Sequence, residues 1–302
     1  MPSAQGFLIG LSIAVLLLWG IRRVLHRSLA PQRIPEQKSP GDVGLDYREA
    51  RFPTANDRTL FGWFLPAAQA GAAPTVALLH GWGGNAETLL PLAGPLHQAG
   101  FAVLLFDARC HGRSDEDSFT SLPRFAEDLE HALDWLRQQP EVDRQRLAVV
   151  GHSVGAGAAL LVASRCDDLA AVASIAAFSH PQNMMRRFLA AKHVPYVPFG
   201  RAILRYVQHV IGHRFDDIAP VNTIRQVSCP TLLAHGADDS TVPVAEARAI
   251  HAASSGDHVQ LMVIPGSHDD YGDIEREAQM LVGFLDMHLS GAGERPAAQA
   301  AT

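Results

Sequence analysis

The residue with the clearest chemical potential is Ser153, within the sequence Gly151-His152-Ser153-Val154-Gly155. It lies between an apolar, strand-like run (LAVVG) and a helix-like run of small residues. A strand that passes into a helix here must turn sharply, which exposes the serine hydroxyl, and Gly151 and Gly155 leave room for close strand–helix packing. Because a serine hydroxyl is a poor nucleophile until a base removes its proton, the pattern predicts a nucleophile with a base nearby.

Candidates for the base and for the acid that orients it follow two later apolar runs. TLLAH is followed closely by Asp238 and Asp239, and VQLMVI is followed by Pro265-Gly266-Ser267-His268. If both runs are parallel strands, their carboxyl ends lie at the same edge of the sheet as Ser153. This placement predicts His268 as the general base and one of the two aspartates as the acid.

Backbone donors for a developing oxyanion are expected on two sides of the serine. His80-Gly81-Trp82-Gly83-Gly84 follows the apolar run TVALL, and its glycines allow the backbone to approach a ligand closely. We predict that the Trp82 N–H is one donor and that the Val154 N–H, at the positive end of the helix after Ser153, is the other. Five neighbouring residues are predicted to support the site: His80, Gly81, Gly151, His152 and Gly155.

Short apolar runs alternate with amphipathic segments from about residue 45 to residue 290. This alternation predicts an α/β fold with a mostly parallel central sheet and helices on both faces. The first two strands, at 45–52 and 59–65, are joined by a turn at Asn56-Asp57 and should form an antiparallel edge. Further strands are expected at 75–79, 102–107, 147–151, 171–178, 231–235 and 259–264. Helices are expected at 86–98, 123–137, 154–165, 244–253 and 274–289.

Residues 180–227 interrupt this alternation with sequence of helical character. A connection of this length is typical of a lid or binding element. Within it, a helix at 199–212 would carry one apolar face made of Phe199, Ile203, Tyr206, Val207 and Val210. Two interpretations stay open: a lid helix packed on the core, or a helix that contacts a membrane or lines an apolar substrate entrance.

The N-terminal segment is the most apolar part of the chain. Residues 6–21 read GFLIGLSIAVLLLWGI, about 16 uncharged residues, which is near the lower limit for a membrane-spanning helix. Arg22, Arg23 and Arg27 follow this run, whereas a cleaved signal peptide carries its charge before it. We expect residues 1–30 to be an uncleaved single-pass transmembrane helix with a basic flank, which leaves the catalytic domain in the cytoplasm. The alternative is a helix packed on the domain or on a partner.

Composition limits the remaining possibilities. The chain of 302 residues is 47% apolar and 19% charged, which is typical of a globular protein with a substantial core. A net charge of −6 gives no reason to expect nucleic acid as a partner, and three scattered cysteines predict neither a disulfide framework nor a zinc knuckle. Residues 31–44, rich in Pro, Gln, Lys and Ser, are a predicted linker, and residues 291–302 are a predicted disordered tail.

These motifs together resemble the α/β-hydrolase superfamily, in particular its bacterial esterase, monoacylglycerol-lipase-like and serine-aminopeptidase-like branch. The resemblance is carried by HGWGG at 80–84, DARCHGRSD at 107–115, GHSVG at 151–155, HGADDSTVP at 235–243 and GSH at 266–268. It implies an α/β-hydrolase domain over residues 45–290, and the family pattern HGxxDxxVP aligns the acid with Asp239 rather than Asp238. Cys110 departs from the related pattern, which usually has glycine at that position.

The resemblance implies acyl transfer through a Ser153–His268–Asp239 triad, with no metal and no organic cofactor. The sequence therefore predicts a membrane-anchored serine hydrolase that cleaves small-molecule or lipid-like carboxylic esters. Peptidase, amidase, thioesterase and acyltransferase activities remain alternatives, because one fold hosts them all with the same triad. A non-catalytic binding protein of the same fold is a further alternative.

Overall fold

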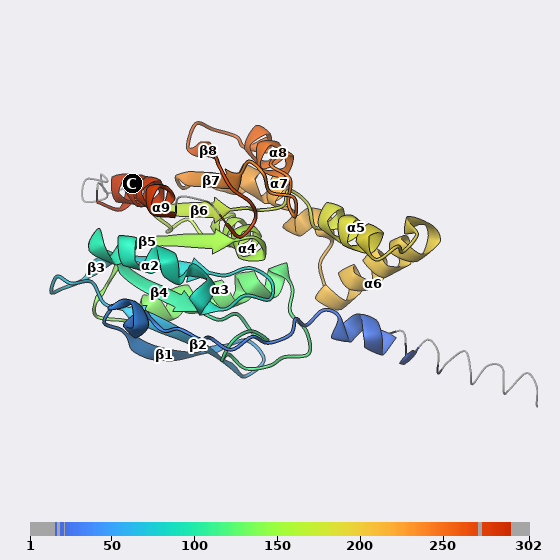
Figure 1. Ribbon diagram of the computed structural model, residues 1–302, viewed down its shortest axis with the longest axis horizontal. Helices are drawn as coiled ribbons and strands as arrows, with labels where there is room; N and C mark the ends of the chain where they lie inside the picture. Colours follow the sequence, from blue (N-terminus) through green and yellow to red (C-terminus); the bar gives the residue numbers. More distant parts are fainter. Residues whose placement is uncertain (1–15, 17–18, 21, 271–273, 291–302) are drawn as a thin grey trace, which may run out of the picture.

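The structure is a computed structural model and describes residues 16, 19–20, 22–270 and 274–290. Figure 1 shows a central sheet between two layers of helices, with a separate helical element and the N-terminal helical segment at the same end of the molecule. The sheet has eight strands in the order β1-β2-β4-β3-β5-β6-β7-β8. The predicted α/β class and mostly parallel sheet are therefore confirmed.

The antiparallel edge of the sheet is formed by β1 (Arg48–Thr54) and β2 (Arg58–Leu65), and β2 also pairs antiparallel with β4 (Ala102–Phe106). The turn between β1 and β2 has positive φ at both Asn56 (61°) and Asp57 (54°). Two left-handed residues are what a tight hairpin turn requires, and Asn and Asp tolerate them. The predicted turn is thus the one observed.

The remaining strands are parallel, and all except the edge strand β8 are largely buried: β3 (Ala73–Leu79), β5 (Val142–His152), β6 (Ala171–Ile175), β7 (Thr231–Gly236) and β8 (Val259–Ile264). The predicted starts of β1 and β5 and the predicted end of β6 differ from the structure by three residues or more, since β1 begins at Arg48 rather than at residue 45. Strand β5 begins earlier than expected because Val142 pairs with Ala73 ahead of the apolar run. Strand β6 ends at Ile175 rather than Phe178, since Ala176 turns to a φ of 57°.

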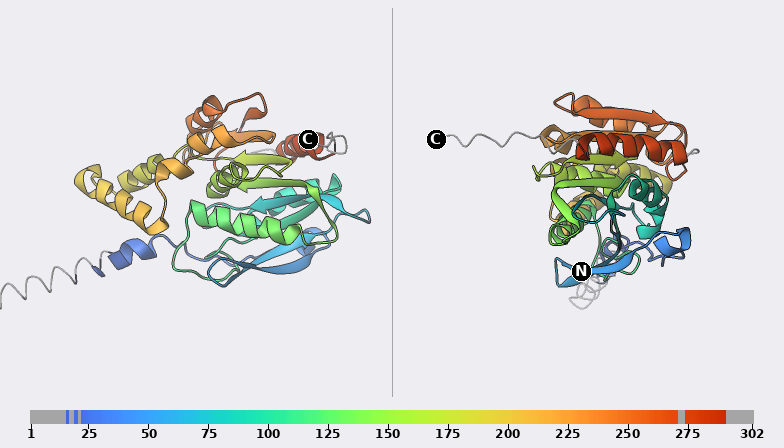
Figure 2. Two further views of the ribbon diagram at one scale, coloured as in Figure 1. Left: turned by 180° about the vertical axis from the view of Figure 1, so that it is seen from behind. Right: turned by 90° about the vertical axis from the view of Figure 1, so that its left-hand side faces the viewer.

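Helices cover both faces of the sheet, as Figures 1 and 2 show. One core contains residues of α3 (Leu122–Leu136), α4 (Val154–Ala163) and α8 (Ala245–Ala253). The opposite core contains residues of α2 (Leu90–Gln98), entered through the 3₁₀ turn η2 (Ala86–Leu89), and of α9 (Ile274–Leu289). Burial of these two apolar faces holds the parallel strands rigidly, so that loops at their carboxyl ends are fixed in position.

The predicted lid is a chain of short helices between β6 and β7. It consists of α5 (Pro181–Ala191), the irregular turn η3 (Tyr196–Gly200), α6 (Arg201–Ile211), η4 (Phe215–Ile218), α7 (Pro220–Thr223) and η5 (Ile224–Gln226). The buried face of α6 differs from the predicted one: Leu204 and Val207 are buried, whereas Phe199 is 61% exposed. Phe199 precedes α6 in the irregular turn, so helical spacing does not place it.

The segment before the domain is described only in part. Residues 22–27 are helical, residues 31–39 are extended and irregular, and η1 (Pro40–Val43) leads into the first strand. The predicted transmembrane helix and the predicted tail at 291–302 lie almost entirely outside the described residues. Among the described residues, none of the helices has both the length and the apolar character needed to cross a bilayer.

Candidate active site

Ser153 lies at the apex of a sharp turn between β5 and α4. Its φ of 55° and ψ of −114° are strained for a residue with a side chain. The turn is held by the Ser153 N–H, which donates to Ile175 O at 2.8 Å, and by close strand–helix contact. A Cβ on Gly151 would overlap the Gly155 backbone, and a Cβ on Gly155 would overlap the carbonyl oxygens of Leu79 and His80. Both glycines are therefore required by packing.

Three predicted residues meet at the carboxyl edge of the sheet. The Ser153 hydroxyl is 3.0 Å from Nε2 of His268, and Nδ1 of His268 is 2.6 Å from Oδ2 of Asp239. Asp239 follows β7, and His268 follows β8. The arrangement can pass a proton from the serine to the imidazole while the carboxylate holds the ring in one tautomer. Its chemical capability is activation of the serine for attack on a carbonyl.

The acidic member is Asp239, and its neighbour Asp238 is exposed at the surface. The Asp239 side chain is fully buried, and its Oδ1 accepts hydrogen bonds from the N–H groups of Thr241 (2.9 Å) and Val242 (2.7 Å). Nε2 of His235 is a further 3.4 Å from Oδ2. The hydrogen-bond partner of that His235 nitrogen is Val242 O at 2.6 Å, so the two backbone N–H groups are what fix which oxygen of Asp239 faces His268.

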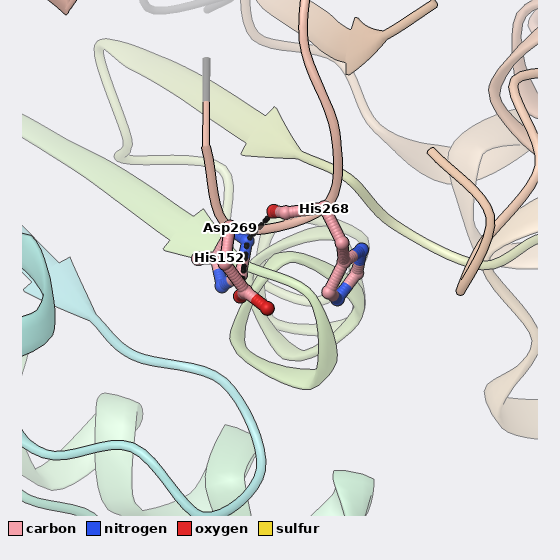
Figure 3. Close-up of side chains that lie close together, drawn as sticks. All are labelled: His152, His268 and Asp269. Carbon is pink, nitrogen blue, oxygen red and sulfur yellow. Dashed lines mark hydrogen bonds and ion pairs between the residues drawn. The ribbon is translucent and has the colours of Figure 1, made fainter. Parts of the chain in front are cut away.

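His152 supports the loop that carries His268. Its Nε2 is 2.9 Å from the His268 carbonyl oxygen, a contact visible in Figure 3. Burial lowers the pKa of His152, so the neutral ring donates this hydrogen bond at neutral pH. His152, His268 and Asp269 are close enough together to hold a metal ion. However, both ring nitrogens of His268 already face Asp239 and Ser153, so metal binding there would dismantle the hydrogen-bonded chain.

The glycine loop after β3 lies directly against the serine. A Cβ built on Gly81 would be 3.0 Å from the Ser153 Cβ. The His80 ring links this loop to the loop after β4. Its Nδ1 is 2.7 Å from Gly81 O, and its Nε2 accepts a hydrogen bond from the Ala108 N–H at 3.1 Å. Burial, with the nearby His111, holds the pKa of His80 well below its usual range. Trp82 follows Gly81 in this loop, and Val154, the first residue of α4, directly follows Ser153.

The loop after β4 contains a buried charge network that the sequence analysis did not resolve. Arg109 is fully buried and its Nε donates to Asp128 at 2.7 Å, while the Arg109 N–H donates to the same carboxylate at 2.8 Å. Cys110, the departure from the family pattern, has a φ of 67°, a conformation that favours glycine. In the sequence, the one indication of this buried charge network was Asp128, a charged residue on the apolar face of a predicted helix.

The segment before the domain is docked on the same loops. Arg33 donates to the carbonyl oxygens of Gly112 and Ser114 at 2.8 and 2.6 Å, and the Asn85 side chain donates to Ile34 O at 2.9 Å. Burial, followed by the hydrogen bond with Glu36, raises the pKa of Asp107 well above its ordinary value. The hydrogen bonds made by Arg33 and Ile34 therefore hold part of the predicted linker against the domain.

A small apolar cavity of about 150 Å³ opens between α2 and α9. Ile175, Met262 and Leu281 contribute to its lining, and His152 forms part of its wall. Ser153, Asp239 and His268 do not line it. It therefore neighbours the reaction centre without including the nucleophile.

Comparison with known proteins agrees with this fold. The family model described as serine aminopeptidase, S33 matches residues 71–218. The chain is 28% identical over 257 residues to the uncharacterized protein Rv2307c of Mycobacterium tuberculosis, covering 85% of this chain and 83% of that protein. It is 25% identical over 260 residues to the uncharacterized protein YfhR of Escherichia coli, covering 83% and 84%.

Solved structures of esterases share the fold. The esterase Pf2001 of Pyrococcus furiosus superimposes with a TM-score of 0.70 at 23% identity, covering 86% of this chain and 99% of that one. Est1E of Butyrivibrio proteoclasticus, solved with ferulic acid bound, gives a TM-score of 0.66 at 18% identity, covering 80% and 100%. At these identities the likeness establishes the fold.

Proposed function

The chain belongs to the α/β-hydrolase superfamily, and on that premise we propose that it is a serine hydrolase that cleaves carboxylic esters through Ser153, His268 and Asp239. The observation that carries the proposal is the hydrogen-bonded chain from the Ser153 hydroxyl through His268 to Asp239. It supports acyl transfer because it couples a nucleophile to a base and the base to a buried carboxylate.

The first half of the reaction forms an acyl-enzyme. Nε2 of His268 takes the hydroxyl proton as the Ser153 oxygen attacks the ester carbonyl carbon, and the carbonyl oxygen becomes an oxyanion. The backbone N–H groups of Trp82 and Val154 donate to that oxyanion in this proposal. When the intermediate collapses, His268 returns the proton to the departing alcohol, and the acyl group stays on Ser153.

The second half releases the acid. Water donates its proton to Nε2 of His268 and attacks the acyl carbon, and the second oxyanion is held by the same two N–H groups. Collapse restores the Ser153 hydroxyl with the proton from His268. Asp239 remains ionised throughout and stabilises the imidazolium that forms twice in each cycle.

The substrate class follows from the proposed location of the enzyme. We assign residues 1–30 to a membrane anchor, on the strength of the apolar run at 6–21 and the arginines that follow it. An esterase held at a membrane by this segment, with its domain on the cytoplasmic side, meets esters that partition into lipid. Acyl or lipid-like esters are therefore the proposed substrates.

A second candidate activity is peptide hydrolysis from a chain terminus, which the matching serine aminopeptidase family model favours. The same triad serves both reactions, so the sequence of proton transfers is unchanged. The two activities differ in what the binding surface around Ser153 accepts.

The test uses the full-length chain in detergent micelles, with Ser153→Ala and the surface serine Ser255→Ala as the matched control. Each protein is assayed on aryl esters of increasing acyl length and on an aminoacyl arylamide. The proposal predicts ester hydrolysis that Ser153→Ala abolishes and Ser255→Ala retains. Cleavage of the arylamide alone would replace the ester proposal with the peptidase one, and ester hydrolysis by Ser153→Ala would refute the assigned nucleophile.

A further inference from the structure

The lid and the N-terminal helical segment lie side by side at one end of the molecule. Figures 1 and 2 both show α5 and α6 beside the first described residues, at the end opposite α9. Tyr206 of α6 donates its hydroxyl to Arg22 O at 3.5 Å. Whatever surrounds the N-terminal segment therefore also lies close to the lid.

Exposed apolar side chains gather at this end. Of the twelve large apolar residues that are exposed among the described residues, six belong to the lid or the N-terminal segment. In the lid these are Phe188 (55% exposed), Val197 (65%) and Phe199 (61%), and in the N-terminal segment they are Leu16, Trp19 and Val24. A soluble surface seldom gathers large apolar groups in this way unless something covers them. The apolar run at residues 6–21 continues the same character along the chain.

The charge of the lid is opposite to that of the whole chain. The lid, residues 181–226, contains seven Lys and Arg residues and two Asp residues, and none of the acids precedes Asp216, although the chain as a whole carries a net charge of −6. Lys192, Arg201 and Arg205 of this set are exposed and form no ion pair with a described residue. Arg205 also lines a polar hollow with His209, His213, Arg214 and Asp216, in which Arg214 is paired with Asp216. A surface with cations around the exposed apolar side chains of the lid is complementary to an anionic lipid surface.

We propose that the lid docks on an anionic lipid bilayer, with Phe188, Val197 and Phe199 inserted at the headgroup boundary and the lid cations among the headgroups. The lid leaves the sheet at the end of β6, the edge that carries Ser153, so docking turns the reaction centre towards the membrane. Lipid-like esters then reach the serine from the bilayer rather than through water. The proposal rests on the membrane attachment proposed above and extends it from the anchor to the lid.

The test places an environment-sensitive fluorophore on single cysteines of the full chain in anionic vesicles, in a Cys166→Ser background. Cys110 and Cys229 are buried and need no change. The lid sites are Phe188→Cys and Val197→Cys, and the matched control is Met287→Cys, an exposed apolar position of α9 (69% exposed). Quenching by lipids that carry a spin label near the headgroup is expected at both lid sites and not at the control site.

A second set of variants tests the role of charge. Replacing Lys192, Arg201 and Arg205 by Gln should weaken lid docking about 100-fold, because each cation near an anionic surface contributes roughly a further five-fold. The matched control replaces Arg58, Arg144 and Arg248, three exposed cations elsewhere on the domain, and should leave docking unchanged. High salt should act in the same direction as the lid variant.

The outcomes separate this proposal from the others. Vesicle flotation without quenching at the lid sites would overturn lid docking and leave the anchor standing, whereas failure of the chain to float would overturn both. Equal quenching at Met287→Cys and at the lid sites would also overturn it, since the whole domain would then be embedded. Ester hydrolysis in micelles is measured independently, so its loss has no bearing on these results.

Discussion

Replacement of Asp239 by Asn should abolish most activity without unfolding the protein. Oδ1 of Asp239 accepts two backbone hydrogen bonds, from Thr241 and Val242, so in Asp239→Asn the amide oxygen takes this place. The amide NH₂ then faces Nδ1 of His268, where the carboxylate oxygen now lies at 2.6 Å. An NH₂ group can only donate, so Nδ1 must become the acceptor and the ring proton must move to Nε2.

That tautomer cannot take a proton from the Ser153 hydroxyl, because its Nε2 already carries one. We expect kcat to fall by about 10⁴-fold, or about 5 kcal/mol of transition-state stabilisation. The assay is kcat and KM on an aryl ester, with thermal unfolding to confirm the fold. The matched control is Asp238→Asn, whose side chain is exposed, and which should stay within two-fold of the parent. Activity of Asp239→Asn within ten-fold of the parent, or an equal loss in Asp238→Asn, would refute this reasoning.

Three further predictions concern stability. Gly155→Ala should lower the free energy of unfolding by about 1–3 kcal/mol, because the new Cβ overlaps the neighbouring strand. The control Gly94→Ala, with nothing within 4 Å of its Cβ, should raise that free energy slightly. Both values are measured by urea unfolding. Asp128→Ala should cost about 2–3 kcal/mol, because Arg109 loses its fully buried partner while Asp117 and Glu127 still pair with it. The Arg109→Met/Asp128→Leu double variant should cost less in the same measurement. Burial works to raise the pKa of Glu246, but hydrogen bonds from the start of the lid outweigh it and hold that pKa below its ordinary value of 4.5. The contribution of ionised Glu246 to the free energy of unfolding is therefore complete above pH 4.5 and is lost as the pH falls through the depressed folded-state pKa. In Glu246→Gln the free energy of unfolding should depend less on pH in that window. An unchanged dependence on pH would contradict the assignment.

Strand–helix alternation and strand-end residues were enough to predict the sheet and the placement of Ser153, His268 and Asp239. These features depend on local patterns, namely buried apolar runs and the residues that directly follow them. Asp239 could be separated from Asp238 only through the family pattern, because both follow the same strand. The structure distinguishes them by burial, which depends on how the loop folds back onto β7.

Contacts between distant segments could not be predicted. The hydrogen bonds from Arg33 to the loop after β4 join residues about 80 positions apart, and nothing in the linker composition indicates them. The buried face of α6 was only partly correct, since Leu204 and not Phe199 faces the core. Helical spacing gives the apolar faces of a helix, but the neighbours that bury one of them are set by tertiary packing.

The most direct test of the central claim is covalent labelling of the full chain by a fluorophosphonate, followed by intact mass and peptide mapping. An assembled triad activates one serine, so we predict a single adduct at Ser153, no adduct in Ser153→Ala, and labelling at least 100-fold slower in Asp239→Asn. Folded protein that remains unlabelled, or an adduct at any other serine, would contradict the account.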